Sequence, residues 1–270
     1  MSFEGKPPLV NQAPIFDGSK FQHQVVAIPS LRKTASDGFT FLRWALDEAT
    51  GSTSFVNTGS AVAGNCNVVA GTIRAGRTSI LNNANGRGSF DSGVGAYIRT
   101  ATQGAAMNPS TTVFSTHGWI KQRAIAVNGR ILTKWFSSDG VTPSAAPDAW
   151  GLLTQAPTGN LYVQINNGGV NKGTTPFGTR DLIRQNDWIH IAATFNAGTV
   201  KIYVNGSLAQ SDATFPASIN FNGASGGSWS IGGSPVGFDF DGDCSDWVVD
   251  SGVERSDAYF KALVNLAWNR

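Results

Sequence analysis

Residues 187–210 read DWIHIAATFNAGTVKIYVNGSLAQ, and this stretch decides the fold class. Through 188–195 one set of side chains, Trp188, His190, Ala192 and Thr194, alternates with a second set, Ile189, Ile191, Ala193 and Phe195. Apolar and polar side chains alternate through 200–204, and both segments therefore have the period of two that is typical of strands. Asn205 and Gly206 follow, and both tolerate the positive φ that a two-residue hairpin turn requires. The stretch therefore predicts three consecutive antiparallel strands, the third of which begins after the Asn-Gly turn.

The composition favours one large β domain. The 270 residues include 32 glycines and only 14% charged residues, which suits many strands joined by tight turns. A chain of this length can bury most of the surface that its unfolded form exposes. The net charge of +2 comes from dispersed Lys and Arg, so the basic patch of a nucleic-acid-binding protein is missing. No window approaches the roughly 18 consecutive apolar residues of a membrane span, and we expect no membrane insertion.

The three-stranded stretch resembles a signature of the laminin-G-like, concanavalin A-like jelly-roll family, W-x-H-x-A-x-T-F followed by G-x-V-x-I-Y-V-N-G. Other fragments resemble further elements of that family in the same order, and the resemblance covers about residues 39–268. It implies an all-β fold, a two-sheet antiparallel jelly-roll sandwich. The fragments are FTFLRWALDEATGS, SFDSGVGAYIRT, MNPSTTVFSTHGWIKQRAIAVNGRILTKW, SWSIGGSP and FDFDGDCSDWVVDSGVERSDAYFKALVNLA.

The chain divides into an extended N-terminal arm, residues 1–38, and a jelly-roll domain, residues 39–270. The arm carries four prolines up to position 29 and shows little periodicity apart from a candidate edge strand at 21–28. Such a segment is ordered only when something holds it. Either the arm packs on its own domain or a neighbouring subunit holds it.

A short helix is predicted at the C-terminal end. Ser256 is a suitable N-cap, and Tyr259, Phe260, Leu263 and Leu266 repeat at helical spacing after it. These four side chains should form the apolar stripe of the helix.

The two cysteines, Cys66 and Cys244, cannot form a disulfide framework for a domain of this size. We interpret them as reduced structural thiols. The family resemblance places Cys66 near the first strands and Cys244 on the last strand, which leaves a bridge between them open.

The sequence does not predict an enzyme. Some endoglucanases of the resembled fold use paired carboxylates on one strand, and retaining glycosidases need two carboxyl groups about 5 Å apart. The only glutamates are Glu4, Glu48 and Glu254, and none lies in an E-x-D-x-E arrangement. His23, His117 and His190 are far apart in the sequence, so we expect no zinc site and no catalytic residues.

The acidic segment GFDFDGDCSDWVVD, residues 237–250, is a candidate calcium site. Asp239, Asp241 and Asp243 alternate, so in an extended segment their carboxylates share one side, and hard oxygen ligands suit Ca²⁺. The resemblance adds that many laminin-G-like domains hold calcium at the rim of the sandwich. The alternative is a solvated acidic turn without a metal.

The tryptophans give a candidate glycan site. Trp135 and Trp150 flank the loop SSDGVTPSAAPDA, and loops on a rigid sandwich are common binding sites. We expect these two indoles to contact carbohydrate; the alternative is that they pack the loop onto the sheet. The tryptophans expected in the core are Trp44, Trp119, Trp188, Trp229 and Trp247.

Together these features are most similar to those of a viral structural protein. We expect a non-enzymatic bacteriophage virion component, that is, a capsid decoration, fibre or tail-associated protein, assembled in the host cytoplasm because MSFEGKPPLVNQAPIF contains no export signal. The arm would bind other virion proteins in a homo-oligomer, and the sandwich would contact cell-surface glycans. One alternative is a free-standing carbohydrate-binding module or lectin, which an exposed aromatic platform would favour. The other is a glycoside-active enzyme, which a cleft with two carboxylates would favour.

Overall fold

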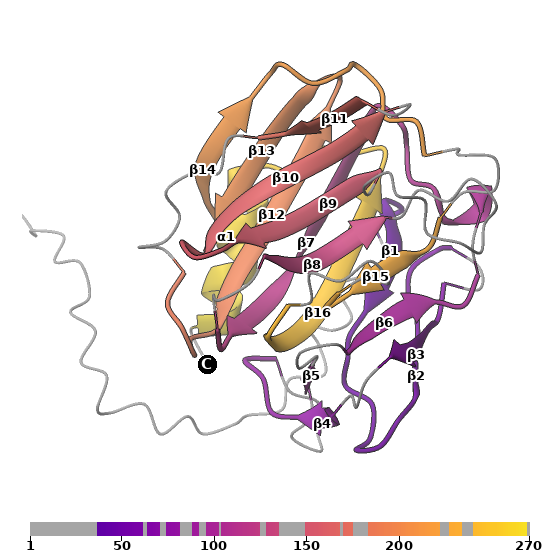
Figure 1. Ribbon diagram of the computed structural model, residues 1–270, viewed down its shortest axis with the longest axis vertical. Coiled ribbons are helices and arrows are strands. Elements are labelled where there is room, and N and C mark those ends of the chain that lie inside the picture. The colour runs from indigo at the N-terminus through magenta and orange to yellow at the C-terminus, as the bar shows by residue number, and fades with distance from the viewer. Residues whose placement is uncertain are drawn as a thin grey trace, which may run out of the picture.

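The computed structural model describes residues 37–61, 64–70, 74–81, 88–91, 96–102, 104–124, 128–134, 149–167, 170–174, 183–221, 227–233 and 240–268. Within these residues the chain forms two antiparallel sheets, stacked face to face, and a C-terminal helix, which confirms the predicted sandwich (Figure 1). The predicted arm lies outside the described residues up to position 36, and so does its candidate edge strand.

Sheet A contains eight described strands in the order β14-β13-β12-β7-β16-β5-β4, and β1 also pairs with β16. The strands are β1 (Thr40–Trp44), β4 (Arg74–Arg77), β5 (Ser89–Asp91), β7 (Val113–Gln122), β12 (Ile189–Asn196), β13 (Thr199–Val204), β14 (Ser207–Asp212) and β16 (Gly242–Ser251).

Sheet B contains eight described strands in the order β11-β10-β9-β8-β15-β6-β3-β2. The strands are β2 (Ser54–Phe55), β3 (Cys66–Ala70), β6 (Tyr97–Thr100), β8 (Gly129–Lys134), β9 (Trp150–Gln155), β10 (Asn160–Asn167), β11 (Val170–Gly173) and β15 (Trp229–Ile231). A 3₁₀ turn, Ala105–Met107, precedes β7. The consecutive strands β7 and β8 thus belong to opposite sheets.

The predicted three-stranded stretch is present as β12, β13 and β14. Strands β12 and β13 pair with Ile191 opposite Val204, and β14 returns after the turn. Asn205 and Gly206 both have positive φ, 48° and 78°, which confirms the predicted hairpin turn.

The inner face of β12 carries Ile189, Ile191, Ala193 and Phe195, which belong to the core between the sheets. The prediction that Trp188 lies in this core is wrong, because Trp188 is on the outer face of sheet A and only partly buried. Alternation did not identify the inner face, since a helix covers the outer face as well and both sets of side chains are largely apolar.

Three of the five tryptophans expected in the core, Trp44, Trp229 and Trp247, do lie between the sheets with 0% exposure. Trp119 is also buried, but on the outer face of sheet A beside Trp188. Trp247 of β16 lies against Gly118 of β7: a Cβ at position 118 would come within 2.7 Å of the indole Cε2. The absence of a side chain at 118 therefore makes room for the indole.

The predicted helix is α1 (Asp257–Trp268). Ser256 caps it, because its Oγ accepts a hydrogen bond from the Tyr259 amide at 3.3 Å. The predicted stripe is correct for Phe260, which is buried, whereas Leu266 is 50% exposed. Val264 and Ala267 are buried instead.

Figure 1 shows α1 behind β12 and β13, on the side of sheet A away from sheet B. Phe260 packs there on Ala192 and Tyr203, which are outward-facing residues of these two strands. No helix among the described residues has the length and apolar character needed to cross a membrane.

Both cysteines are free thiols in the structure. Cys66 lies on β3 in sheet B and Cys244 on β16 in sheet A, and both are fully buried in the core. Burial raises the pKa of each thiol well above its ordinary value, so both are unreactive at neutral pH.

Candidate functional site

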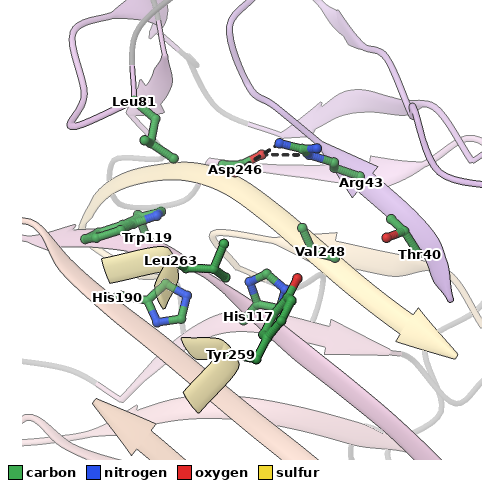
Figure 2. Close-up of a pocket in the computed structure, with 10 residues that line it drawn as sticks. All are labelled: Thr40, Arg43, Leu81, His117, Trp119, His190, Asp246, Val248, Tyr259 and Leu263. Atoms are coloured by element: carbon green, nitrogen blue, oxygen red, sulfur yellow. Dashed lines mark hydrogen bonds and ion pairs between the residues drawn. The ribbon is translucent and has the colours of Figure 1, made fainter. Parts of the chain in front are cut away.

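Helix α1 borders two cavities of different size. The helix-covered cavity lies between α1 and the outer face of sheet A and has a volume of about 30 Å³. The rim pocket lies at the N-terminal end of α1 and has a volume of about 360 Å³. Figure 2 shows the residues that line the helix-covered cavity: Thr40, Arg43, Leu81, His117, Trp119, His190, Asp246, Val248, Tyr259 and Leu263.

Two histidines from neighbouring strands meet in the helix-covered cavity. His117 of β7 and His190 of β12 lie diagonally on the paired strands, and their ring centroids are 5.6 Å apart. His190 has 0% exposure, and neither of its ring nitrogens has a hydrogen-bond partner among the described residues. Burial, and secondarily the neighbouring His117, lowers the pKa of His190 well below its ordinary value, so its imidazole is neutral at pH 7.

A buried ion pair lies beside the histidines. Arg255 donates two hydrogen bonds to Asp250, at 2.8 and 3.1 Å, and a third to Asp37 at 2.5 Å. Burial favours the neutral form of Asp250, but the contacts from His117 and Arg255 outweigh it and hold the pKa of Asp250 below its usual range. Asp250 is therefore an anion that is already neutralised by Arg255.

A second ion pair closes the opposite side of the cavity. Arg43 of β1 donates to Asp246 at 3.1 Å, and Figure 2 shows this pair across the cavity from the two imidazoles. Asp246 has a φ of 44° and sits where the register of β16 with β7 shifts between Ser245 and Val248. The bulge turns the Asp246 carboxylate toward Arg43.

The size of the helix-covered cavity limits its occupants. About 30 Å³ holds one or two water molecules and no sugar ring. Among the described residues, no three His, Cys, Asp or Glu side chains converge in a way that could hold a metal ion. The cavity is a buried polar centre under a helix.

The rim pocket is large enough for a small ligand, since ligand pockets begin at about 300 Å³. Its wall is formed by β13, β14, the segment before α1 and the first residue of α1. The lining residues are Lys201, Tyr203, Leu208, Glu254, Arg255, Ser256 and Asp257.

Charged groups of both signs face the rim pocket. Lys201 donates to Glu254 at 2.8 Å, and their side chains are 32% and 22% exposed. Burial favours the neutral form of Glu254, but the hydrogen bonds from Lys201 and Asn196 outweigh it and lower its pKa. The Leu208 side chain, 51% exposed, adds an apolar surface. The pocket thus offers donors, acceptors and an apolar wall to a polar ligand.

The predicted glycan site is not formed as expected. Trp150 has 0% exposure and packs edge-on against Phe114 at 4.7 Å, so it cannot offer an indole face to a sugar. The prediction for Trp150 is wrong, because Trp150 is the first residue of β9 and shares the inward face with Leu152. Trp135 lies outside the described residues.

The predicted calcium ligands lie close to arginines. Arg123 contacts Asp241 at 2.8 Å and Asp243 at 3.5 Å, and Arg77 contacts Asp243 at 3.1 Å. Arg123 also contacts Asp91 of β5 at 2.5 Å. The repulsion between these carboxylates is therefore relieved by two guanidinium groups. Asp239 lies outside the described residues, and the calcium site stays a prediction.

Sequence reasoning missed the residues around α1. In the sequence 73 positions separate His117 from His190, and only the pairing of β7 with β12 brings them together. The sequence pattern does place both histidines in strands, but it does not show that these two strands are neighbours. Lys201 and Glu254 are also distant in the sequence, and they meet because the segment before α1 lies against β13.

Solved structures with a similar fold include carbohydrate-binding and receptor-binding domains. Domain 4 of AbnA, a GH43 extracellular arabinanase from Geobacillus stearothermophilus in complex with arabinotriose, is 16% identical with a TM-score of 0.61, over 84% of this chain and 99% of that one. The binding domain of botulinum neurotoxin serotype D is 15% identical with a TM-score of 0.55, over 84% and 51% of the two chains.

The receptor-binding domain of botulinum neurotoxin type G is 16% identical with a TM-score of 0.54, and the match again covers 84% of this chain and 51% of that one. The chain thus spans about half of each toxin domain. At these identities the likeness shows a shared fold. No curated protein matches the sequence.

The family, in contrast, is shown by the sequence itself. The family model that matches this chain is described as the concanavalin A-like lectin/glucanases superfamily, and it aligns with residues 91–249. That span runs from the end of β5 to the last strand, β16, and includes the three-stranded stretch β12–β14. This chain belongs to the concanavalin A-like lectin/glucanases superfamily.

Proposed function

We propose that this chain is a non-enzymatic recognition protein that binds carbohydrate in the rim pocket, and that it serves as a structural component of a bacteriophage virion. The rim pocket is the observation that carries the proposal, because it has room for a sugar ring and is lined by positively and negatively charged side chains that can form hydrogen bonds. Domain 4 of AbnA, a similar fold, was solved in complex with arabinotriose, which adds support for a carbohydrate ligand.

The chemistry of the pocket suits a hydroxyl-rich ligand. A carboxylate such as Glu254 accepts hydrogen bonds from sugar hydroxyls, and the Lys201 ammonium donates to their oxygens. The two groups are already paired at 2.8 Å, so a ligand would find them oriented and would need little rearrangement. Leu208 would pack against the apolar face of a sugar ring.

Binding is tested by screening a glycan array, with arabinotriose among the probes, followed by titration calorimetry on each hit. We expect Glu254→Gln to weaken binding by about tenfold or more, because a hydrogen bond to a charged group contributes roughly 1.5–3 kcal/mol. Arg74→Ala is the matched control, since Arg74 is exposed on β4 at the opposite edge of sheet A. Equal affinities for both variants would contradict the rim pocket as the site.

The non-enzymatic part of the proposal has its own test. Each glycan hit is incubated with the protein, and new reducing ends are measured over hours. We expect none, and steady release of reducing ends would favour a glycoside-active enzyme.

The proposed role as a virion component is tested on phage particles. We expect mass spectrometry of purified phage particles to find the chain together with coat proteins. A chain that is recovered only as a free monomer, while still binding glycans, would favour a free-standing lectin.

A further inference from the structure

The His190 imidazole is confined under α1 without a polar partner. It has 0% exposure, and within the described part of the chain both of its ring nitrogens lack a hydrogen bond. Aromatic rings surround it: Trp119 at 5.2 Å, His117 at 5.6 Å and Phe260 at 5.8 Å between centroids. A neutral ring is accommodated in this environment, whereas a cationic ring would be taken out of bulk water without a described counterion to pair with it.

Among the described residues, no carboxylate near His190 is free to receive a cationic partner. Asp250 lies 3.7 Å from His117 and is held by Arg255, and Asp246 is held by Arg43. Tyr259 and Tyr203 are neutral, because burial raises the pKa of both phenols, that of Tyr259 to about 12. The described titratable and charged groups that line this cavity with His190 are Arg43 on β1, His117 on β7, Asp246 on β16 and Tyr259 on α1. Asp250 on β16, Arg255 before α1 and Tyr203 on β13 contact His117, Tyr259 and Phe260, respectively.

Helix α1 is the element that can move when the ring is charged. Its Phe260 ring lies 5.5 Å from His117 and 4.9 Å from Tyr203, so this side chain covers the histidines directly. The strands beneath cannot separate easily, since β7 is paired along its length with β12 and with β16. The chain enters α1 from β16 through residues 252–256, and α1 lies on the sandwich through its buried side chains Phe260, Val264 and Ala267.

We propose that α1 is an acid-released lid, which leaves the outer face of sheet A when His190 takes up a proton. Release would bring water to the imidazolium and separate Phe260 from the two histidines. The sandwich would stay folded, because its core between the sheets does not include α1.

The direction of the pH dependence follows from the difference between the pKa of His190 in the closed state and the ordinary pKa of an exposed histidine. The pKa of His190 is lowered by burial and by His117, so the released state binds a proton near pH 6.5 and the closed state only at lower pH. The closed state is favoured fully above pH 6.5 and loses stability as the pH falls below it. The pKa of Asp250 is held below its usual range, so that carboxylate stays charged through this window.

Hydrogen exchange read by mass spectrometry tests the lid at pH 7.5 and 5.0, with rates corrected for the intrinsic pH dependence. We expect the opening equilibrium constant of peptides within 257–268 to rise about 30-fold, the ratio for one group of pKa near 6.5 that is protonated only when released. Peptides from β7 and β12 should keep their protection. Loss of protection in all of them together would overturn the proposal.

Variants assign the response to one ring. His190→Phe and His190→Leu both remove the titrating group, and they replace it with side chains of different size in case one variant does not fold. Each variant that folds should have the same opening equilibrium constant for α1 at both pH values. The control is Lys134→Met on sheet B, which removes another group with a lowered pKa and should leave the 30-fold response of α1 intact. An acid response that persists in either His190 variant would refute the lid.

Discussion

At the scale of single residues, the least expected side chain is Lys134. It ends β8 with 0% exposure, and its ammonium donates to the Gly227 carbonyl. Burial lowers its pKa to about 7, and no described carboxylate pairs with it. A lysine at a strand end normally extends its amine to water, so the sequence alone did not mark this residue.

Lys134→Met is expected to stabilise the protein at pH 7 by roughly 1–3 kcal/mol, because it removes a buried group that is charged in the unfolded chain. The unfolded lysine titrates near 10.4 and the folded one at about 7, so the parent should gain stability as the pH rises from 7 to 10. Denaturant melts across this range check the prediction. The variant should lack the gain, and a parallel rise in both proteins would contradict it.

The sequence pattern did not show which tryptophan side chains point into the core. Alternation predicts a strand at Trp188, but a period of two does not say which face of the strand is inside, and Trp150 was expected at the edge of a loop and not on the inner face of a strand. Trp150 turned inward toward Phe114, and Trp188 turned outward toward α1. Only the three-dimensional pairing decides between these faces.

Among the secondary-structure elements, the β13–β14 turn contacts α1 directly and limits how closely the helix can approach sheet A. Gly206 in the β13–β14 turn has a φ of 78°, and a Cβ there would lie 2.7 Å from the Lys261 backbone. The glycine is needed for its backbone conformation and also for the close approach of the helix.

Gly206→Ala is expected to destabilise the protein by roughly 1–3 kcal/mol and to increase hydrogen exchange in α1, because strain and overlap add. Gly252→Ala is the matched control, since Gly252 has a φ of 79° but a Cβ there would meet none of the described residues within 4 Å. Thermal melts and exchange of both variants measure the difference. If the two variants behave alike, the helix contact contributes nothing.

Local elements were predicted well because their signals are short in sequence. The Asn-Gly turn and the Ser256 cap each need only a few neighbouring residues, and both are present as predicted. Long-range pairing carries no such local signal. The alignment of β16 with β7 joins residues more than 100 positions apart, and the cavity under α1 depends on it.

At the scale of the whole molecule, the sandwich could be predicted because five fragments resembled one family in the right order. The covering of sheet A by α1 could not be predicted, and with it both cavities were missed. The arm is still a prediction, but its exit point is defined: Asp37 bonds Arg255 at 2.5 Å beside Asp250.

Deleting residues 2–30 is expected to leave the unfolding free energy within about 0.5 kcal/mol of the parent, because Asp37 and every described strand are retained. The same deletion should abolish oligomerisation or incorporation into particles, which light scattering and particle pelleting measure. Asp37→Asn in the full chain is the control for the junction, and it should weaken the fold while keeping assembly. A truncated chain that cannot fold would place the domain boundary earlier.

The close contact between Gly118 and Trp247 has a consequence for how this sequence can diverge. The indole occupies the space that any side chain at 118 would need, so neither position can change freely while the other stays the same. Descendants that gain a side chain at 118 should carry a smaller residue at 247, and those that keep the tryptophan should keep the glycine. The two positions, 129 residues apart, should therefore evolve as a single character.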